Sequence, residues 1–471
     1  MKLARYEVPA DKCTQHCDPK LFDFECTRDL APLREFIGQE RAIRGIRFGL
    51  SMKNRGYNIY VAGLSGTGKT SMVKTYINKL IEKRQLENPV YPDDWCYLHN
   101  FADSDRPQIL SLPQGKGKVF RDQISNFLQQ LKDELAKAFS SEEYKAHRKS
   151  IVGEGQAGQQ KLFAEIGEEA RRQGFVLQVT PVGPALIPVM GGKPMTEDEY
   201  MNLGESARKD LEAKRNVLLK KLQTTFEQAH ELERQTTEKL QNTDKAVADY
   251  TVSRLFEHLI KEYQKSEAII KYLNDLKTFT LNNLDLFKTR EEQPPQAAMF
   301  GLPAVIARGV DPFLPFQVNV FVDNSGTKGP PVIIESNPIF SNMFGKIERR
   351  FLFGAYLSDH TMLKPGALHL ASGGYLLLSA QDVLINPAVW PTLKRCIKNL
   401  ELRIEDPFEQ FGLLAPQGIR AEPMPIKVKI VLIGDAELYQ LLAMYDEDFW
   451  EIFKVKADFN FEVEKTEKNV L

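Results

Sequence analysis

The chain has 471 residues, with 62 lysines and arginines against 63 aspartates and glutamates, and a formal net charge of -1. This length is enough for about three domains, and the balanced charge excludes a global field that would attract nucleic acid or an anionic membrane. No apolar run approaches the ~18 residues of a membrane helix, and residues 1–10 contain no signal-peptide core. We therefore expect a soluble, cytoplasmic protein with no membrane partner.

Residues 1–35 are mixed in composition and are expected to form an N-terminal arm or small subdomain. Cys13, Cys17 and Cys26 cluster there, but their spacing matches no zinc module well, so free thiols are favoured over a metal site. The chain has five cysteines, an odd number, which indicates a reducing compartment rather than a disulfide framework.

The most informative stretch is an apolar run from Tyr57 to Ala62 that leads into a glycine-rich turn and a helix-compatible segment. The turn fits the pattern GxxxxGK[ST], which between a strand and a helix predicts a loop that binds nucleotide phosphates. Glycines allow backbone N–H groups to surround a phosphate, and the helix N-terminus adds a positive dipole end. Lys69 would supply charge toward the β- and γ-phosphates, and the Thr70 hydroxyl would be a ligand of Mg²⁺. The candidate ATP-binding residues in the turn are Gly63, Ser65, Gly66, Thr67, Gly68, Lys69 and Thr70.

Residues 36–118 are interpreted as the first part of a nucleotide-binding core. Within them, residues 95–98 are predicted to be a second buried strand, and residues 100–117 a polar, proline-rich loop.

Residues 119–288 are predicted to be a helical insertion. Apolar residues recur at helical spacing over 119–139 and again over 161–173, and a β-hairpin is expected near 175–194. A long second helical arm follows, and its a and d positions predict an antiparallel coiled coil. These positions are Leu211, Leu218, Leu222, Ala229 and Leu232.

Residues 289–304 have linker composition, and residues 305–471 are interpreted as the second part of the core. Strands alternate with helices there, so the predicted fold class is α/β, a doubly wound parallel sheet interrupted by the long helical insertion. The expected strands are 317–322, 331–335, 375–378 and 427–433, and the expected helices are 387–398 and 436–444.

Together these residues resemble the AAA+ module of bacterial Lon-like ATP-dependent serine proteases, the type with a long helical insert in the ATPase domain. The resemblance implies an AAA+ ATPase that binds ATP and Mg²⁺, assembles as a homo-hexamer and feeds unfolded polypeptide to a Ser/Lys protease domain. That domain is expected outside these 471 residues, so the chain is interpreted as the ATPase portion of a longer protease or a truncated homologue. The matching segments are FIGQERAIRGIRFGL, GYNIYVAGLSGTGKT, DDWCYLHNF, RPQILSLPQGKG, GKPMTEDEY, VNVFVDNSG, PGALHLASGGYLLL and VLIGDAELYQLL.

The resemblance also implies roles for single residues. Ile37 and Gly38 would lie against the adenine ring, and Phe351, Leu352 and Phe353 would face the ring pore and grip polypeptide. Without the family, the apolar cluster at the latter positions is read as ordinary core packing.

Departures from the family pattern bear on hydrolysis. Ser379 follows the strand at 375–378, where an Asp that holds Mg²⁺ is expected, and Asp382 would lie on a different face if it replaced that Asp. Gln381 and Asp382 remain the candidate catalytic residues, and Lys456 stands in for an arginine that would act on a neighbouring subunit. Asp435 lies where a γ-phosphate sensor is expected, although a helix N-cap suits it equally. We therefore expect firm ATP binding and weak hydrolysis.

Two other functions stay open. In one, ATP binding alone sets the assembly of a scaffold or regulator whose coiled-coil arm holds a partner. In the other, the chain would be a DNA-acting ATPase, which needs a signature loop or a stripe of basic residues. The sequence offers neither.

Overall fold

A computed structural model divides the chain into two compact units, and each is described by itself. Unit 1 comprises residues 1–124 and 313–471, and unit 2 comprises residues 125–312. The predicted linker at 289–304 lies outside the described residues. The structure describes residues 7–13, 20, 24–26, 28–29, 37–64, 66, 68–87, 90–180, 183–190, 193–195, 200, 203–288, 311–352, 355–405 and 418–463.

Unit 1 is built around a five-stranded sheet in which every neighbouring pair of strands is parallel. This confirms the predicted parallel sheet and the four strand predictions that fall within it. The edge strand β17 was missed, because its sequence VKAD buries only Val455 and Ala457 and gives little apolar signal. The strand order is β17 (Val455–Asp458), β1 (Ile59–Ala62), β16 (Lys429–Gly434), β13 (Tyr375–Ser379) and β8 (Val332–Glu335).

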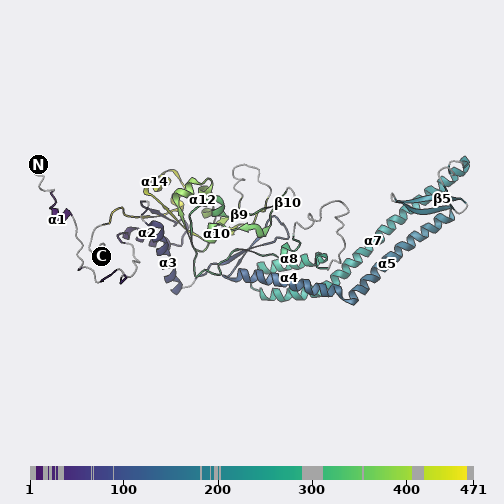
Figure 1. Ribbon diagram of the computed structural model, residues 1–471, viewed down its shortest axis with the longest axis horizontal. Helices are drawn as coiled ribbons and strands as arrows, with labels where there is room; N and C mark the ends of the chain where they lie inside the picture. The colour runs from purple at the N-terminus through teal and green to yellow at the C-terminus, as the bar shows by residue number, and fades with distance from the viewer. Residues whose placement is uncertain are drawn as a thin grey trace. The chain divides into compact units, whose positions relative to one another are not determined.

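Helices cover both faces of this sheet, as the doubly wound prediction requires (Figure 1). On β1, Ile59 and Val61 pack toward α2 (Glu40–Ser51) and α3 (Lys69–Glu87), whereas Tyr60 and Ala62 pack toward the opposite face. That alternation follows from the two-residue period of a strand. The opposite face is covered by α11 (Ala380–Ile385), α12 (Val389–Asn399), α14 (Ala436–Tyr445) and α15 (Phe449–Ile452).

A second, antiparallel sheet in unit 1 places β2 (Asp94–Leu98) between β3 (Gln108–Leu112) and β7 (Asn319–Val322). The prediction of a loop over 100–117 was therefore wrong, because Pro107 before QILSL and Pro113 and Gly115 after it concealed a short strand. The remaining short elements of unit 1 and the N-terminal segment are α1 (Ala10–Cys13), η6 (Leu314–Phe316), α9 (Phe340–Phe344), β9 (Lys346–Ile347), β10 (Arg350–Leu352), β11 (Ala355–Leu357), η7 (His360–Met362), β12 (Leu363–Lys364), α10 (Ala367–Leu370), β14 (Glu401–Leu402) and β15 (Met424–Pro425).

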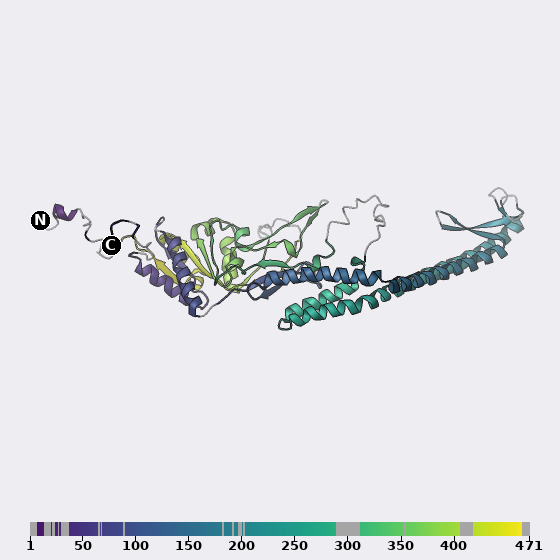
Figure 2. The same ribbon diagram turned by 60° about the horizontal axis from the view of Figure 1, so that its bottom comes forward.

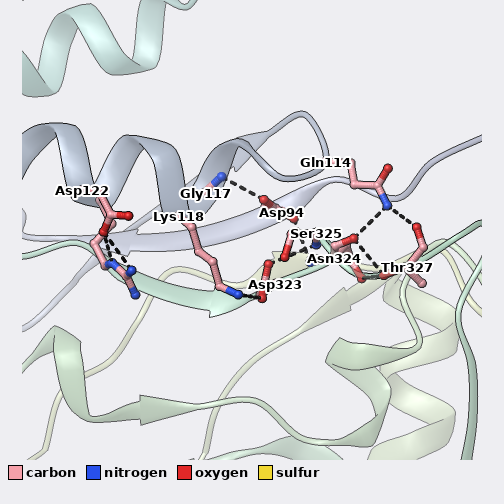
Figure 3. A network of polar contacts seen from close by, with 10 residues as sticks. Asp94, Gln114, Gly117, Lys118, Asp122, Asp323, Asn324, Ser325 and Thr327 are labelled. Carbon is pink, nitrogen blue, oxygen red and sulfur yellow. Dashed lines mark hydrogen bonds and ion pairs between the residues drawn. The ribbon is translucent and has the colours of Figure 1, made fainter.

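A buried carboxylate ties this second sheet to the start of α4 (Lys116–Ser140), and we call the group the Asp94 clamp (Figure 3). Asp94 is fully buried, and its two oxygens accept hydrogen bonds from the backbone N–H groups of Gly117 and Asn324, each at 2.8 Å. Lys118 forms an ion pair with Asp323 at 2.6 Å beside it. The negative charge is favourable there because it lies at the positive end of a helix dipole. Asp94 thus joins two points of unit 1 that flank the chain segment containing unit 2.

Unit 2 is a helical unit with a small sheet. In the views of Figures 1 and 2, α5 (Glu142–Arg172) and α7 (Glu205–Glu262) run side by side, and β4 (Phe175–Thr180) and β5 (Gly183–Met190) form a hairpin at their end. Leu218, Leu222 and Ala229 of α7 are buried, which confirms their core positions in the predicted coiled coil. The two stretches of helical spacing, 119–139 and 161–173, belong to two helices that are separated at Ser141, because Ser141 caps the start of α5. The unit also contains β6 (Lys193–Pro194), α8 (Glu267–Asn282) and η3 (Leu284–Leu286).

Unit 2 holds a buried polar cluster of its own. The Tyr144 hydroxyl donates to Asp244 at 2.7 Å, and Lys288 forms ion pairs with Asp244 and, at 2.6 Å, with Asp285. Asp244 is 7% exposed, so its charge is neutralised inside the protein. Over the described ranges, no helix is both long enough and apolar enough to cross a membrane.

Candidate nucleotide site

A cavity of about 950 Å³ lies where the carboxyl ends of β1, β16, β13 and β8 meet the start of α3. Ligands of open parallel sheets bind at this edge, because loops and helix N-termini converge there. Its lining includes Gly63, Leu64, Gly66, Gly68, Lys69, Thr70, Ser71, Ile334, Glu335, Ser336, Ser379, Gln381, Asp382, Ile433, Gly434, Asp435, Glu437 and Phe461.

The phosphate loop has the backbone that its glycines were predicted to supply. Gly66 and Gly68 adopt φ values of 81° and 70°, the left-handed region that residues with a Cβ rarely enter. A Cβ on either residue would meet no atom within 4 Å, so the conformation rather than lack of space requires glycine. The loop opens on the cavity, and α3 begins directly after it at Lys69. Ser65 and Thr67 lie outside the described residues.

Lys69 lies across the loop with its ammonium among carbonyl oxygens. Its Nζ donates to the backbone oxygens of Gly63 at 2.6 Å and Leu64 at 2.5 Å. Burial lowers the pKa of Lys69, and the charge of Asp435 opposes that shift only in part. The positive charge of Lys69 is therefore stabilised by the carbonyl dipoles of its own loop, which do not neutralise it.

The end of β13 differs from the predicted arrangement. Ser379 caps α11, and its Oγ accepts a hydrogen bond from the backbone N–H of Asp382 at 3.4 Å. Gln381 and Asp382 lie in the first turn of α11, which starts directly after the strand, and both line the cavity. Asp382 thus reaches the same cavity as Ser379, and its role in place of the missing aspartate stays a prediction.

Glu335 also lines the cavity, and the sequence analysis missed it. It ends β8, the neighbour of β13, and pairs with Leu378 in the register of the two strands. One carboxylate oxygen, Oε1, accepts a hydrogen bond from the backbone N–H of Asn337 at 2.8 Å. The available signal is a Glu at the end of the predicted strand 331–335, whereas the family pattern places the metal-holding carboxylate at the end of the strand 375–378.

Asp435 combines the two roles considered for it. Its side chain caps α14 by accepting from the N–H of Leu438 at 2.6 Å, and it lines the cavity after β16. The N-cap is confirmed, and contact with a γ-phosphate stays a prediction.

The turn at Ile37 and Gly38 is held against the segment that follows β17. Asn460 donates to the Gly38 carbonyl at 3.0 Å, and the Gln39 side chain accepts from the backbone N–H of Asn460 at 2.9 Å. One residue further, Phe461 lines the cavity with 65% of its surface exposed. The turn is therefore tied to a segment that reaches the cavity, and its contact with adenine stays a prediction.

Two other predicted groups lie away from this cavity. Lys456 lies on β17, where it forms an ion pair with Asp458 at 2.9 Å and places its ammonium 4.6 Å from the centre of the Tyr439 ring. Its charge is thus engaged within its own chain, and action on a neighbouring subunit stays a prediction.

The predicted pore-loop residues lie on the β10–β11 hairpin. Phe351 and Tyr356 are paired across the two strands, are 64% and 58% exposed, and bring their ring centres to 5.1 Å. Plain core packing is excluded for Phe351. Leu352 is the last residue of β10, and Phe353 lies outside the described residues.

The N-terminal cysteines show no metal site within the described ranges. Cys13 and Cys26 are free and exposed, and Cys17 is not among the described residues. Nor do three or more His, Cys, Asp or Glu side chains come together as metal ligands in any described part of the chain.

The fold and the cavity define a nucleotide-binding protein of the phosphate-loop class. Residues 328–460 match the family described as the LonB-like AAA domain, and residues 94–127 match the Lon-like LonC helical domain. A putative Lon protease homolog of Escherichia coli (strain K12) is 31% identical over 93 residues, which cover 19% of this chain and 15% of that protein. The chain therefore contains a LonB-like AAA domain and is a distant homologue of that protein. An AAA domain of this family implies an ATPase that binds ATP.

The solved structure of NtrX from Brucella abortus is 16% identical, with a TM-score of 0.19, and the match covers 28% of this chain and 26% of that one. Nothing about fold or function follows from so low a score.

Proposed function

We propose that this chain is the ATP-driven part of a Lon-like protease, which binds ATP with Mg²⁺ in the cavity, assembles as a homo-hexamer and passes unfolded polypeptide to a Ser/Lys protease domain. The observation that carries the proposal is Lys69 within a glycine-rich loop at the carboxyl edge of a parallel sheet. Together with the backbone N–H groups at the start of α3, its charge suits a polyphosphate.

The oxygen-bearing side chains of the cavity suit Mg²⁺. The cavity offers the Thr70 hydroxyl and the carboxylates of Glu335, Asp382 and Glu437. Mg²⁺ prefers oxygen ligands and is held through one or two carboxylates plus the phosphates of a substrate, so no cage of protein ligands is needed. When bound, the ion would neutralise charge that develops on the phosphates.

The exposed β10–β11 hairpin supports contact with polypeptide. Phe351 and Tyr356 form a pair of aromatic rings that the core does not cover. Large exposed aromatic side chains are typical of protein-binding surfaces.

A second function is favoured by Ser379 and Lys456, which leave the site without the strand-end carboxylate and the free arginine of a fast ATPase. In that case the chain would be a scaffold whose assembly is set by ATP binding. ATP turnover that rises when unfolded polypeptide is added would favour the protease subunit, whereas assembly on ATP binding without turnover would favour the scaffold.

The proposal is tested by measuring ATP affinity for the wild-type chain and for Lys69→Ala by calorimetry. Loss of a charged hydrogen-bond donor to phosphate should weaken binding by about 10- to 100-fold. Lys74→Ala is the matched control, since Lys74 is exposed on the same helix and outside the cavity lining. Equal affinities of Lys69→Ala and the wild type would contradict the assignment.

A further inference from the structure

The cavity has too few positive groups to neutralise the charge of a bound nucleotide. The described residues of its lining contain one cationic side chain, Lys69, and four carboxylates, which are Glu335, Asp382, Asp435 and Glu437. A triphosphate would therefore meet net negative charge unless a cation entered with it. In phosphate-loop enzymes, a carboxylate at the end of a core strand next to the phosphate loop holds that cation. Here that strand is β13, which pairs with β16, and its last residue is Ser379.

We propose that Glu335 supplies the metal-holding carboxylate that Ser379 cannot, from the end of the neighbouring strand. This inference rests on the proposed ATP binding and names a residue that serves the metal. Glu335 and Leu378 are register partners, so the glutamate lies directly beside the strand residue that precedes Ser379. A glutamate side chain is one methylene longer than an aspartate side chain, which extends its reach from the adjacent strand.

The local contacts of Glu335 leave part of its carboxylate available. Oε1 is oriented by the hydrogen bond from the Asn337 N–H, an i to i+2 contact that fixes the side chain against its own turn. Over the described ranges, Oε2 has no hydrogen-bond or ion-pair partner. The carboxylate is half-exposed and lines the cavity, so an ion can reach it.

The other acids of the cavity are less suited to this role. Asp435 is used as the cap of α14. Asp382 and Glu437 lie in the first turns of α11 and α14, where the helix dipole already stabilises a negative charge. Glu335 alone among the four lies on a strand, beside the residue whose chemistry is missing.

The test compares the affinity for ATPγS in EDTA and in saturating MgCl₂, measured by calorimetry on the full chain. Wild type should bind more tightly with Mg²⁺, and Glu335→Gln should reduce that gain by about 10- to 100-fold, as expected when a group that supports a bound metal is removed. In EDTA the same variant should bind as tightly as wild type or more tightly, because a like charge has been removed. A structural defect would weaken binding under both conditions.

Two variants make the comparison specific. Glu437→Gln removes the same charge from the same cavity and should keep the Mg²⁺ gain. Ser379→Asp in the Glu335→Gln background should restore the gain, and it keeps the α11 cap because aspartate also serves as an N-cap. Thermal unfolding confirms that each variant is folded.

The outcomes separate the two proposals. If wild type does not bind ATPγS, the proposed function fails and this inference fails with it. If wild type binds with a Mg²⁺ gain that Glu335→Gln keeps, or that Asp382→Asn or Glu437→Gln loses instead, only the role of Glu335 is overturned. Loss of hydrolysis in Glu335→Gln with an unchanged Mg²⁺ gain would also overturn the metal-holding role.

Discussion

Lys69 of unit 1 and Lys288 of unit 2 are both partly buried lysines, but they have different surroundings. Lys288 contacts the carboxylates of Asp244 and Asp285, which raise its pKa even though burial, the largest contribution, lowers it. Among the described residues, the hydrogen-bond partners of Lys69 are carbonyl oxygens, and burial lowers its pKa.

This difference in partners distinguishes a lysine charge that serves the structure from one that is available to a ligand. Lys288 is neutralised by its own chain, so its removal would leave a buried carboxylate without its ion-pair partner. Lys69 is solvated by dipoles, so its charge can still attract an anion at little cost to the loop. The same distinction applies to Asp244, which is paired, and to Glu335, whose Oε2 has no partner among the described residues.

Among the charged groups, the largest effect on stability is expected for Asp244→Ala. It would leave the Lys288 charge and the Tyr144 hydroxyl without their buried partner, and should lower the free energy of unfolding by about 3 to 5 kcal/mol. Urea unfolding followed by circular dichroism measures the change. In Asp285→Ala the loss should stay below ~1 kcal/mol, because the Asp285 side chain is 91% exposed. Equal losses for the two variants would contradict the structural role of Asp244.

A smaller and pH-dependent effect is expected for Asp446→Asn. Burial, the largest contribution, raises the pKa of Asp446, but hydrogen bonds from Lys394 at 2.8 Å and Trp390 at 2.6 Å outweigh it and lower the pKa below its usual value. At pH 7 the variant should lose about 2 kcal/mol of unfolding free energy, the scale of hydrogen bonds to a charged group.

The sign of the pH dependence follows from the lowered pKa of the folded state. The stabilisation from Asp446 is complete above the unfolded pKa of ~3.9 and is lost as the pH falls through the folded value. The stability difference between wild type and Asp446→Asn should therefore shrink as the pH falls below ~4. Glu447→Gln, an exposed neighbour, should show little difference at any pH. A gap that widened toward low pH would refute the ion-pair explanation.

The smallest stability effect is expected for Phe351→Ala, within about 0.5 kcal/mol, because the ring is exposed. The fully buried Phe344 provides the contrast, since Phe344→Ala should cost about 3 to 5 kcal/mol. If the hairpin binds polypeptide, Phe351→Ala should nevertheless reduce the stimulation of ATP turnover by an unfolded protein. Unchanged stimulation would remove the hairpin from the substrate path.

The features predicted correctly from the sequence are those with a strong local signal. Gly66, Gly68 and Lys69 form a motif whose spacing fixes the backbone, and the buried strands β1, β13 and β16 are continuous apolar runs. β17 and β3 are short and only partly apolar, so turn-forming neighbours concealed them.

The site was predicted incompletely because strand adjacency is a tertiary property. The sequence shows that Glu335 ends a strand, but only the pairing of Glu335 with Leu378 shows that it lies beside Ser379. The position of Asp382 in the cavity lining depends in the same way on the start of α11 directly after β13.

The Asp94 clamp has a consequence for how this chain can vary. Because Asp94 binds the backbone N–H groups of both Gly117 and Asn324, the two ends of the chain segment that contains unit 2 are fixed to one carboxylate of unit 1. The entropy of closing a flexible segment rises only slowly with its length, by about 0.6 kcal/mol for each doubling. Unit 2 could therefore be lengthened, shortened or exchanged for another module during evolution or engineering, with little effect on the parallel sheet and the cavity at its edge.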